Sequence, residues 1–175
     1  MKIVTKRLVI RPFTFGDDVD LYEMCSDINT ARDAGWKPHK DLETSKNILF
    51  GYIYGDETFA ISLRDGGKVI GTISLYRSLI RKNIHCRELG FCLNKKYRHQ
   101  GFMTEAVSAV LDYGFNHMYL DLIMVCHHEK NYESQNVIKK FPFTYEGTLR
   151  KYRKLYDETI VDGVMYSMTK EEYRR

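Results

Sequence analysis

Hydrophobic positions change their spacing along the chain, and these changes separate strands from helices. Alternation of apolar and polar residues is typical of a strand, whereas recurrence every three or four residues is typical of a helix. The pattern predicts, in chain order, a strand at 3–12, helices at 17–25 and 41–52, strands at 58–63, 68–76 and 87–93, a helix at 103–115, a strand at 122–126, a helix at 132–140, and strands at 143–148 and 160–168.

Two of these elements decide the fold class. The helix at 103–115 carries one apolar stripe, and residues 122–126 form a continuous apolar run, which is typical of a strand covered on both faces. A turn signal, Asp65-Gly66-Gly67, joins two of the strands as a hairpin. Strands that alternate with helices in this order indicate an α/β (α+β) fold with a central mixed sheet.

The chain has 175 residues, of which 43% are apolar and 29% charged. A chain of this length can bury one core without a disulfide or a metal. Thirteen tyrosines and nine phenylalanines argue against disorder, and no repeat or flexible linker divides the sequence. We therefore expect a single domain over residues 1–175.

The net charge of +4 is mild, and the charges are interspersed. The densest basic runs lie at 95–99 and 150–154. The second is expected on a solvated face, and the first belongs to a candidate phosphate site described below. A contiguous basic face is more typical of nucleic-acid binding, so a small RNA-associated protein is only a third alternative.

The cysteines and the apolar runs bear on location. None of the four cysteines has metal or disulfide-scaffold spacing, which favours a reducing compartment. The first residues lack a signal-like apolar segment, and no run is long enough for a membrane span. We expect a cytoplasmic protein with no metal and no membrane partner.

The most informative stretch runs from Glu88 to Ala106. It predicts a strand, a basic turn containing Gly101, and the start of a helix. The first N–H groups of a helix lack internal partners and carry the positive end of the dipole. Gly101 allows close approach of the backbone, and Arg98 and His99 add donors, so a pyrophosphate is the natural ligand.

At this stretch the chain resembles the GNAT acyltransferase family, in particular its branch that acetylates ribosomal-protein N-termini. The family's pyrophosphate signature, Arg/Gln-x-x-Gly-x-Gly/Ala, is similar to Arg98-x-x-Gly101-x-Met103, with Met103 in place of the small residue. The segments at 5–12, 35–39 and 131–147 also resemble that branch, in the right order. The resemblance covers about residues 5–170.

Two departures from the family stand near the helix at 132–140. Pro142 occupies the position of the usual glycine, so the helix exit must differ. Ile138 stands where many members place a tyrosine acid, a residue that this branch commonly lacks.

The resemblance implies a GNAT fold, with a mostly antiparallel sheet of about seven strands that splays at the acetyl-CoA site and about four flanking helices. It also implies acetyl-CoA as co-substrate and a cofactor-binding set formed by Phe91, Cys92, Leu93, Arg98, His99, Gln100, Gly101, Phe102, Met103, Thr104, Asn131 and Ser134. A backbone N–H of residues 91–93 is expected to bond the thioester oxygen.

Acetyl transfer to an amine needs a base and a proton for the departing thiolate. Glu88, on the strand before the loop, is the candidate base or ammonium anchor, and a strand-edge ion pair is its alternative. Ser134 is the candidate proton donor, or else a helix cap. Trp36 is the candidate wall of the acceptor site, or else a core residue.

The leading hypothesis is an acetyl-CoA-dependent N-acetyltransferase that acts by direct attack in a ternary complex. Its acceptor is a protein N-terminal amine or a small amine such as a polyamine. The alternative from another class is a catalytically weak acyl-CoA sensor or scaffold. A homodimer is an expectation by resemblance only.

Overall fold

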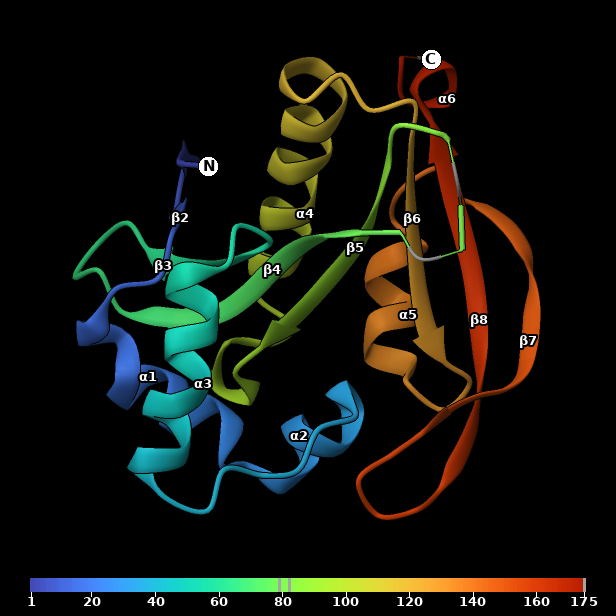
Figure 1. The fold of residues 1–175 in the computed structure, drawn as a ribbon. Coiled ribbons are helices and arrows are strands. Elements are labelled where there is room, and N and C mark those ends of the chain that lie inside the picture. The colour runs from blue at the N-terminus through green and yellow to red at the C-terminus, as the bar shows by residue number, and fades with distance from the viewer. Residues whose placement is uncertain (79, 82, 175) are drawn as a thin grey trace. The chain divides into compact units, whose positions relative to one another are not determined.

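The computed structural model describes residues 1–78, 80–81 and 83–174 (Figure 1). Its strands are β1 (Ile3–Val4), β2 (Leu8–Arg11), β3 (Thr58–Leu63), β4 (Val69–Arg77), β5 (Cys86–Leu93), β6 (Leu122–His128), β7 (Thr144–Lys154) and β8 (Ile160–Thr169). Its helices are α1 (Asp18–Cys25), α2 (Ile28–Ala34), α3 (Leu42–Tyr54), α4 (Phe102–Asp112), α5 (Tyr132–Ile138) and α6 (Lys170–Tyr173).

The predicted α/β class is confirmed, and the strand order is β1-β2-β3-β4-β5-β6-β8-β7. The described residues form eight strands and six helices, where about seven and four were expected. The expected strand at 3–12 is two strands, because Thr5 turns the chain: its backbone N–H donates to the carbonyl of Leu8 at 2.9 Å. Helices α2 and α6 are short, and their patterns were too brief to predict.

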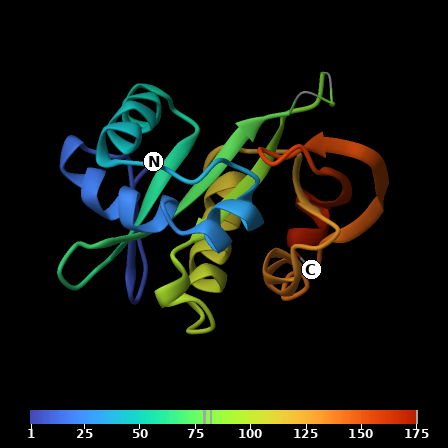
Figure 2. The same cartoon turned by 90° about the horizontal axis from the view of Figure 1, so that it is seen from below.

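By its internal contacts the chain divides into two compact units. The first contains Met1–Ser74 and Phe91–Ala109. Here β2, β3 and β4 pair antiparallel, and Leu8 lies opposite Leu63. Helices α1 and α3 lie against this sheet (Figures 1 and 2). Its core cluster consists of Phe13, Leu21, Met24, Cys25, Leu49, Ala60, Val69 and Cys92.

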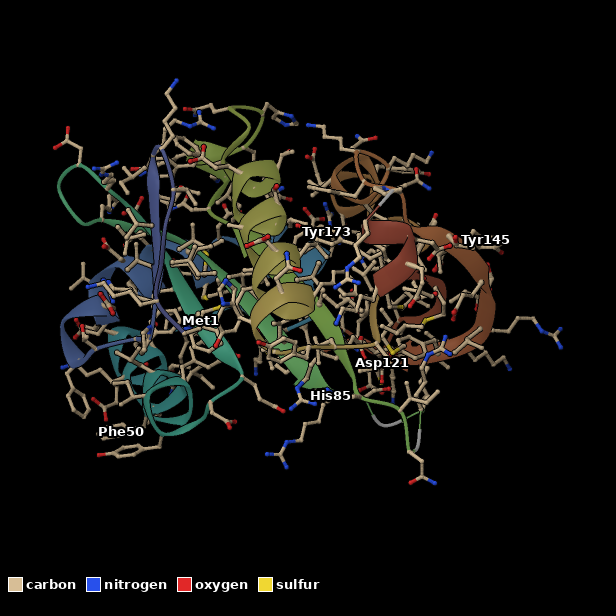
Figure 3. The ribbon with its side chains drawn as sticks, turned by 90° about the horizontal axis from the view of Figure 1, so that it is seen from above. Met1, Phe50, His85, Asp121, Tyr145 and Tyr173 are labelled. Atoms are coloured by element: carbon tan, nitrogen blue, oxygen red, sulfur yellow. The ribbon has the colours of Figure 1, made fainter. Side chains whose placement is uncertain are left out.

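The second unit contains Leu75–Gly90 and Val110–Arg175. Strand β5 pairs parallel with β6, from Cys86 opposite Leu122 to Leu89 opposite Val125, and β6, β8 and β7 are mutually antiparallel. The two parallel strands start together because the Asp121 N–H donates to the His85 carbonyl at 2.8 Å (Figure 3). The core cluster on one sheet face is Cys86, Leu122, Met124 and Met165, with Cys126 packed against it.

Strand β7 is longer than predicted, because the basic run at 150–154 continues it. The register with β8 shifts between Leu149 and Arg153, which marks an irregularity in the ladder. Lys151 has a φ of 53°, and its N–H donates to Asp162 Oδ1 at 2.7 Å. The strand bows outward beside β8 (Figure 1). Bulges of this kind re-aim side chains near functional sites.

Helix α5 ends earlier than the pattern predicts. It stops at Ile138, and a turn follows in which the Phe141 N–H donates to the Ile138 carbonyl at 3.0 Å. Pro142 stands in this turn, where it has no N–H to donate. The different helix exit that Pro142 implied is therefore a short turn before β7.

Candidate functional site

The predicted phosphate loop lies in the first unit, between the end of β5 and the start of α4. His99 and Gly101 have positive φ values of 60° and 79°. A Cβ at Gly101 would meet only the Arg7 guanidinium, at 3.4 Å, so the backbone there is open. The Glu105 N–H donates to the Gly101 carbonyl at 3.0 Å, so α4 begins directly at this open turn. This geometry fits a pyrophosphate bound at a helix N-terminus.

The basic side chains of the loop form ion pairs with acidic residues of α1 and α2 and with the residue that caps α2. The ion pairs are Lys95 with Asp27, Lys96 with Glu23 at 2.9 Å, and Arg98 with Asp33 at 3.0 Å. Hydrogen bonds from Lys96, which has the largest effect, and from Lys68 lower the pKa of Glu23 to about 2. Because these charges are compensated, the backbone N–H groups are the principal anion donors that the loop offers.

Arg98 braces the loop, a role that the sequence did not indicate. Its Nε lies 3.3 Å from the Leu93 carbonyl and its Nη2 lies 3.4 Å from the Thr30 hydroxyl. With Asp33, these contacts join β5, the loop and α2. The Arg98 side chain is 17% exposed, so it makes its contacts mainly inside the unit.

Arg7 is a functional candidate that the sequence analysis missed. Its Nη1 donates to the Gln100 carbonyl at 2.9 Å, and its guanidinium lies 4.3 Å from the centre of the Phe102 ring. Its Nε donates to Glu105 Oε2 at 2.6 Å. Burial opposes ionisation of Glu105, but hydrogen bonds from Thr5 and Arg7 outweigh it and lower the pKa of that carboxyl. The sequence pattern placed Arg7 in the expected strand at 3–12 and gave no signal of a functional role.

The remaining predicted cofactor-binding residues of this unit are placed as follows. Met103 is buried, so its side chain lies in the core and not over the loop backbone. Gln100 is exposed, and its Nε2 donates to the Lys96 carbonyl at 3.0 Å. Phe102 stacks edge-on against Tyr97, and Thr104 lies in the first turn of α4.

Phe91, Cys92 and Leu93 lie beyond the last residue of β5 that pairs with β6. Within the first unit, the Cys92 carbonyl would lie 2.6 Å from a Cβ at Gly71 of β4, so only glycine fits that crossing. Burial raises the pKa of the Cys92 thiol to about 12, which keeps it protonated. Cys92 is therefore a core residue of its strand and not a nucleophile.

Trp36 packs against the core cluster of the first unit. Its ring is partly exposed, and its Nε1 is buried without a hydrogen bond to any residue that the structure describes. Gly35, at φ 81°, ends α2 and turns the chain toward Trp36. The alternative that made Trp36 a core residue accounts for these contacts.

Glu88 lies in the second unit, on β5 opposite Met124 of β6. Its side chain is half-buried, and the described part of the chain contains no ion-pair partner within contact distance of it. Burial raises the pKa of the carboxyl, and the positive charge of Arg153 partly opposes this. The strand-edge pair with Arg87 or Lys95, the alternative to a catalytic role, is absent among the described residues.

Tyr152 and Cys126 lie near Glu88, and the sequence analysis assigned neither to the site. The Tyr152 hydroxyl and the Cys126 sulfur lie close enough for each to influence the pKa of the other. Burial and the nearby Glu88 charge raise the pKa of Cys126 to about 11, and the same two causes raise that of Tyr152. The Tyr152 ring packs on Gly163 of β8, where a Cβ would lie 2.6 Å from the ring. No periodic pattern in the sequence could have shown a tyrosine placed by an irregular strand.

Asn131 and Ser134 lie at the start of α5. Asn131 is buried and caps the helix, because its Oδ1 accepts the Ser134 N–H at 2.9 Å. The cap expected as the alternative role of Ser134 is therefore provided by Asn131. The Ser134 side chain is partly exposed, in the first turn of α5.

No group of three His, Cys, Asp or Glu side chains suited to a metal occurs among the described residues. No helix in the described ranges is long and apolar enough to cross a membrane.

Comparison with known proteins agrees with the fold. Residues 7–144 match the family described as acetyltransferase (GNAT) domain. The chain is 33% identical over 175 residues to the uncharacterized N-acetyltransferase YnaD of Bacillus subtilis, and the match covers 99% of both chains. It is 28% identical to a GNAT-family acetyltransferase structure from Bacillus anthracis, with a TM-score of 0.87 over 98% of this chain and 100% of that one.

A more distant structure shares the fold alone. It is the ribosomal-protein-S5-alanine acetyltransferase of Vibrio fischeri, at 22% identity and a TM-score of 0.77, with all of both chains covered. The family match over most of the chain, together with the full-length relative, identifies the protein as a member of the GNAT family of N-acetyltransferases.

Proposed function

We propose that this acetyltransferase transfers acetyl from acetyl-CoA to a primary amine by direct attack, with Glu88 as the base. The acceptor is a protein N-terminal α-amine, as in ribosomal-protein acetylation, or a small amine. The observation that carries the proposal is the half-buried Glu88 carboxyl, whose pKa burial raises toward the working range of a base. The GNAT family supplies the reaction class.

In this proposal the first unit binds the co-substrate. The turn at Gly101 and the first N–H groups of α4 hold the pyrophosphate, while Arg98 and Arg7 keep the turn in shape. Phe91, Cys92 and Leu93 supply a backbone N–H to the thioester oxygen, which stabilises the oxyanion as it develops.

In the same proposal, residues of the second unit transfer the protons. Glu88 takes a proton from the ammonium, so that the neutral amine attacks the thioester carbon. A C–N bond forms and the C–S bond breaks. Ser134 donates a proton to the departing thiolate, which leaves as the thiol of CoA, and the serine regains a proton from the attacking nitrogen, which thereby becomes the amide. Proton transfer by a positioned side chain contributes about 10²–10⁴-fold to the rate.

Two measurements test the proposal. Acetyl-CoA at a hundred times its dissociation constant should stabilise the protein by ~2.7 kcal/mol, or roughly 5–10 °C in Tm. S-acetylpantetheine, which lacks the pyrophosphate, should stabilise it far less. Release of CoA thiol in the presence of a panel of amines then measures transfer. Stabilisation by acetyl-CoA without turnover on any amine would favour a sensor or scaffold, and no stabilisation would overturn the assignment of the loop.

A further inference from the structure

Strand β7 is exposed along nearly its whole length and, among the described strands, pairs only with β8, as the outermost strand of the second unit. Tyr145, at its start, lies on the outer side of this unit (Figure 3). Four cations follow within five residues, at Arg150, Lys151, Arg153 and Lys154. The strand registers place one of them, Arg153, relative to Glu88.

The registers assign Arg153 to the sheet face that carries Glu88. Glu88 lies opposite Met124, and Cys126, two residues further along β6, lies on the same face and opposite Met165 of β8. Four residues before Met165, and therefore on the same face, stands Val161, which pairs with Arg153 of β7. The field of Arg153 reaches the Glu88 carboxyl, in agreement with this placement.

The other three cations of β7 are engaged differently. Lys154 forms an ion pair with Glu158 across the hairpin end. Lys151 stands at the irregular position with positive φ, and Arg150 precedes it within the same shift of register. Arg153 forms no ion pair with any residue that the structure describes, and it is exposed. It is therefore a guanidinium on the face of the candidate base that no described carboxylate contacts directly.

We infer that the acceptor carries a carboxylate as well as its amine, with the amine directed to Glu88 and the carboxylate bound by Arg153. This inference rests on the proposed function. A guanidinium binds a carboxylate through two parallel hydrogen bonds and stays charged at any working pH. Tyr152, which precedes Arg153 on β7, is exposed and offers apolar surface to the acceptor's carbon atoms.

The same charge discriminates against one acceptor class. A polyamine would bring a second ammonium toward Arg153, and like charges brought together oppose binding. Amino acids, and peptides with an acidic residue near the N-terminus, are therefore favoured as acceptors over polyamines.

The experiment compares acceptors that differ only in the carboxylate. One series consists of ω-amino carboxylates of increasing length, each beside its carboxamide, and the other of Ala-Asp and Ala-Asn peptides. The wild-type enzyme should prefer the carboxylate by about tenfold or more in kcat/KM, which corresponds to ~1.4 kcal/mol. The preference should peak at one chain length in the first series. Equal rates for acid and amide, or faster turnover of diamines, would overturn the inference.

Variants separate Arg153 from the rest of the strand. In Arg153→Gln the ratio between carboxylate and carboxamide should fall to about one. Any effect of Arg153 on Glu88 is common to both acceptors and cancels in this ratio. Arg150→Gln, the matched control, should keep the wild-type ratio. A ratio that survives Arg153→Gln would contradict the assignment.

A failure of the proposed function has a different outcome. If acetyl-CoA stabilises the protein but no amine is acetylated, the protein lacks the proposed catalysis. Calorimetric titration with the same carboxylate and carboxamide acceptors, in the presence of CoA, then tests whether Arg153 binds a carboxylate. Tighter binding of the carboxylate that disappears in Arg153→Gln would support the site. Equal binding of acid and amide would overturn it.

Discussion

Arg7 and Glu105 join the turn between β1 and β2 to the first turn of α4, with Arg7 Nε 2.6 Å from Glu105 Oε2. The other carboxylate oxygen accepts the Arg7 backbone N–H at 2.8 Å and the Thr5 hydroxyl at 2.6 Å. One carboxylate thus holds two segments that are about a hundred residues apart in the chain. Since Arg7 also contacts the Gln100 carbonyl, this connection fixes the shape of the phosphate loop.

Glu105→Gln should weaken both stability and acetyl-CoA binding. The side chain keeps its size but loses its charge, and we expect a loss of ~1–2 kcal/mol in the free energy of unfolding, with a raised KM for acetyl-CoA. The folded-state pKa of Glu105 is lowered, so its stabilisation is present above the unfolded pKa and is lost as the pH falls through the folded value. The gap between wild type and variant in denaturant titrations should therefore shrink in acid.

Glu158→Gln is the control for this variant. Glu158 is exposed, and among the described residues its carboxylate pairs only with Lys154, four residues earlier, so its loss should cost less than ~0.5 kcal/mol. An equal loss in the two variants would contradict a specific role for Glu105.

Glu88→Gln should lower kcat/KM by about 10²–10⁴-fold without a comparable change in acetyl-CoA binding. In the wild type, the rate should rise with pH through an inflection above the ordinary glutamate value of 4.5, because burial raises the pKa of this carboxyl. The variant should lack that inflection. A profile of kcat/KM against pH for both proteins measures this, and a full rate in the variant would assign the base elsewhere.

The same variant should be more stable than the wild type at neutral pH. A raised folded-state pKa means that the stabilisation from Glu88 is present below its unfolded pKa and is lost as the pH rises through the folded value. Gln removes the cost of the ionised, half-buried carboxylate. The difference in unfolding free energy between variant and wild type should vanish in acid. If the variant were less stable than the wild type at neutral pH, favourable contacts of the Glu88 carboxylate would outweigh the cost of its burial.

Much of the fold follows from local patterns. The stripe of α4 and the apolar run of β6 each depend on a period that burial imposes, and the hairpin turn at Gly66 and Gly67 has the positive φ values that glycine allows. The turn at Gly101 was predictable for the same reason: a basic stretch with glycine stood between a strand and a helix.

The rest depends on contacts between distant residues. Nothing near Arg7 in the sequence indicates a contact with Glu105. Arg98 can brace the loop only because Asp33, in α2, lies beside it in the folded chain. The basic run at 150–154 was interpreted as a solvated face, because the shift of register that aims Tyr152 at Gly163 has no local signal. The positions of the side chains in this run depend on how β7 pairs with β8.

Arg98→Ala should raise the dissociation constant for acetyl-CoA by about 10–100-fold, since hydrogen bonds to a charged group contribute ~1.5–3 kcal/mol. Arg98→Lys should rescue little, because an ammonium cannot reach Leu93, Thr30 and Asp33 together. Calorimetric titration with acetyl-CoA measures both variants. Lys95→Ala, which removes a more exposed cation of the same loop, should weaken binding less.

Gly163→Ala should disturb the site through Tyr152. The new Cβ would lie 2.6 Å from the tyrosine ring, so the ring must move, at a cost of ~1–3 kcal/mol in stability. Movement of the ring also displaces the Tyr152 hydroxyl relative to Cys126 and Glu88, and kcat/KM should fall. In Tyr152→Ala the ring is absent, so the added methyl should cost little there, and the double-mutant cycle should give a favourable coupling of similar size. Gly51→Ala, in α3 with open space around it, should be neutral or stabilising. Additive effects of the Gly163 and Tyr152 changes would mean that the ring does not rest on Gly163 in solution.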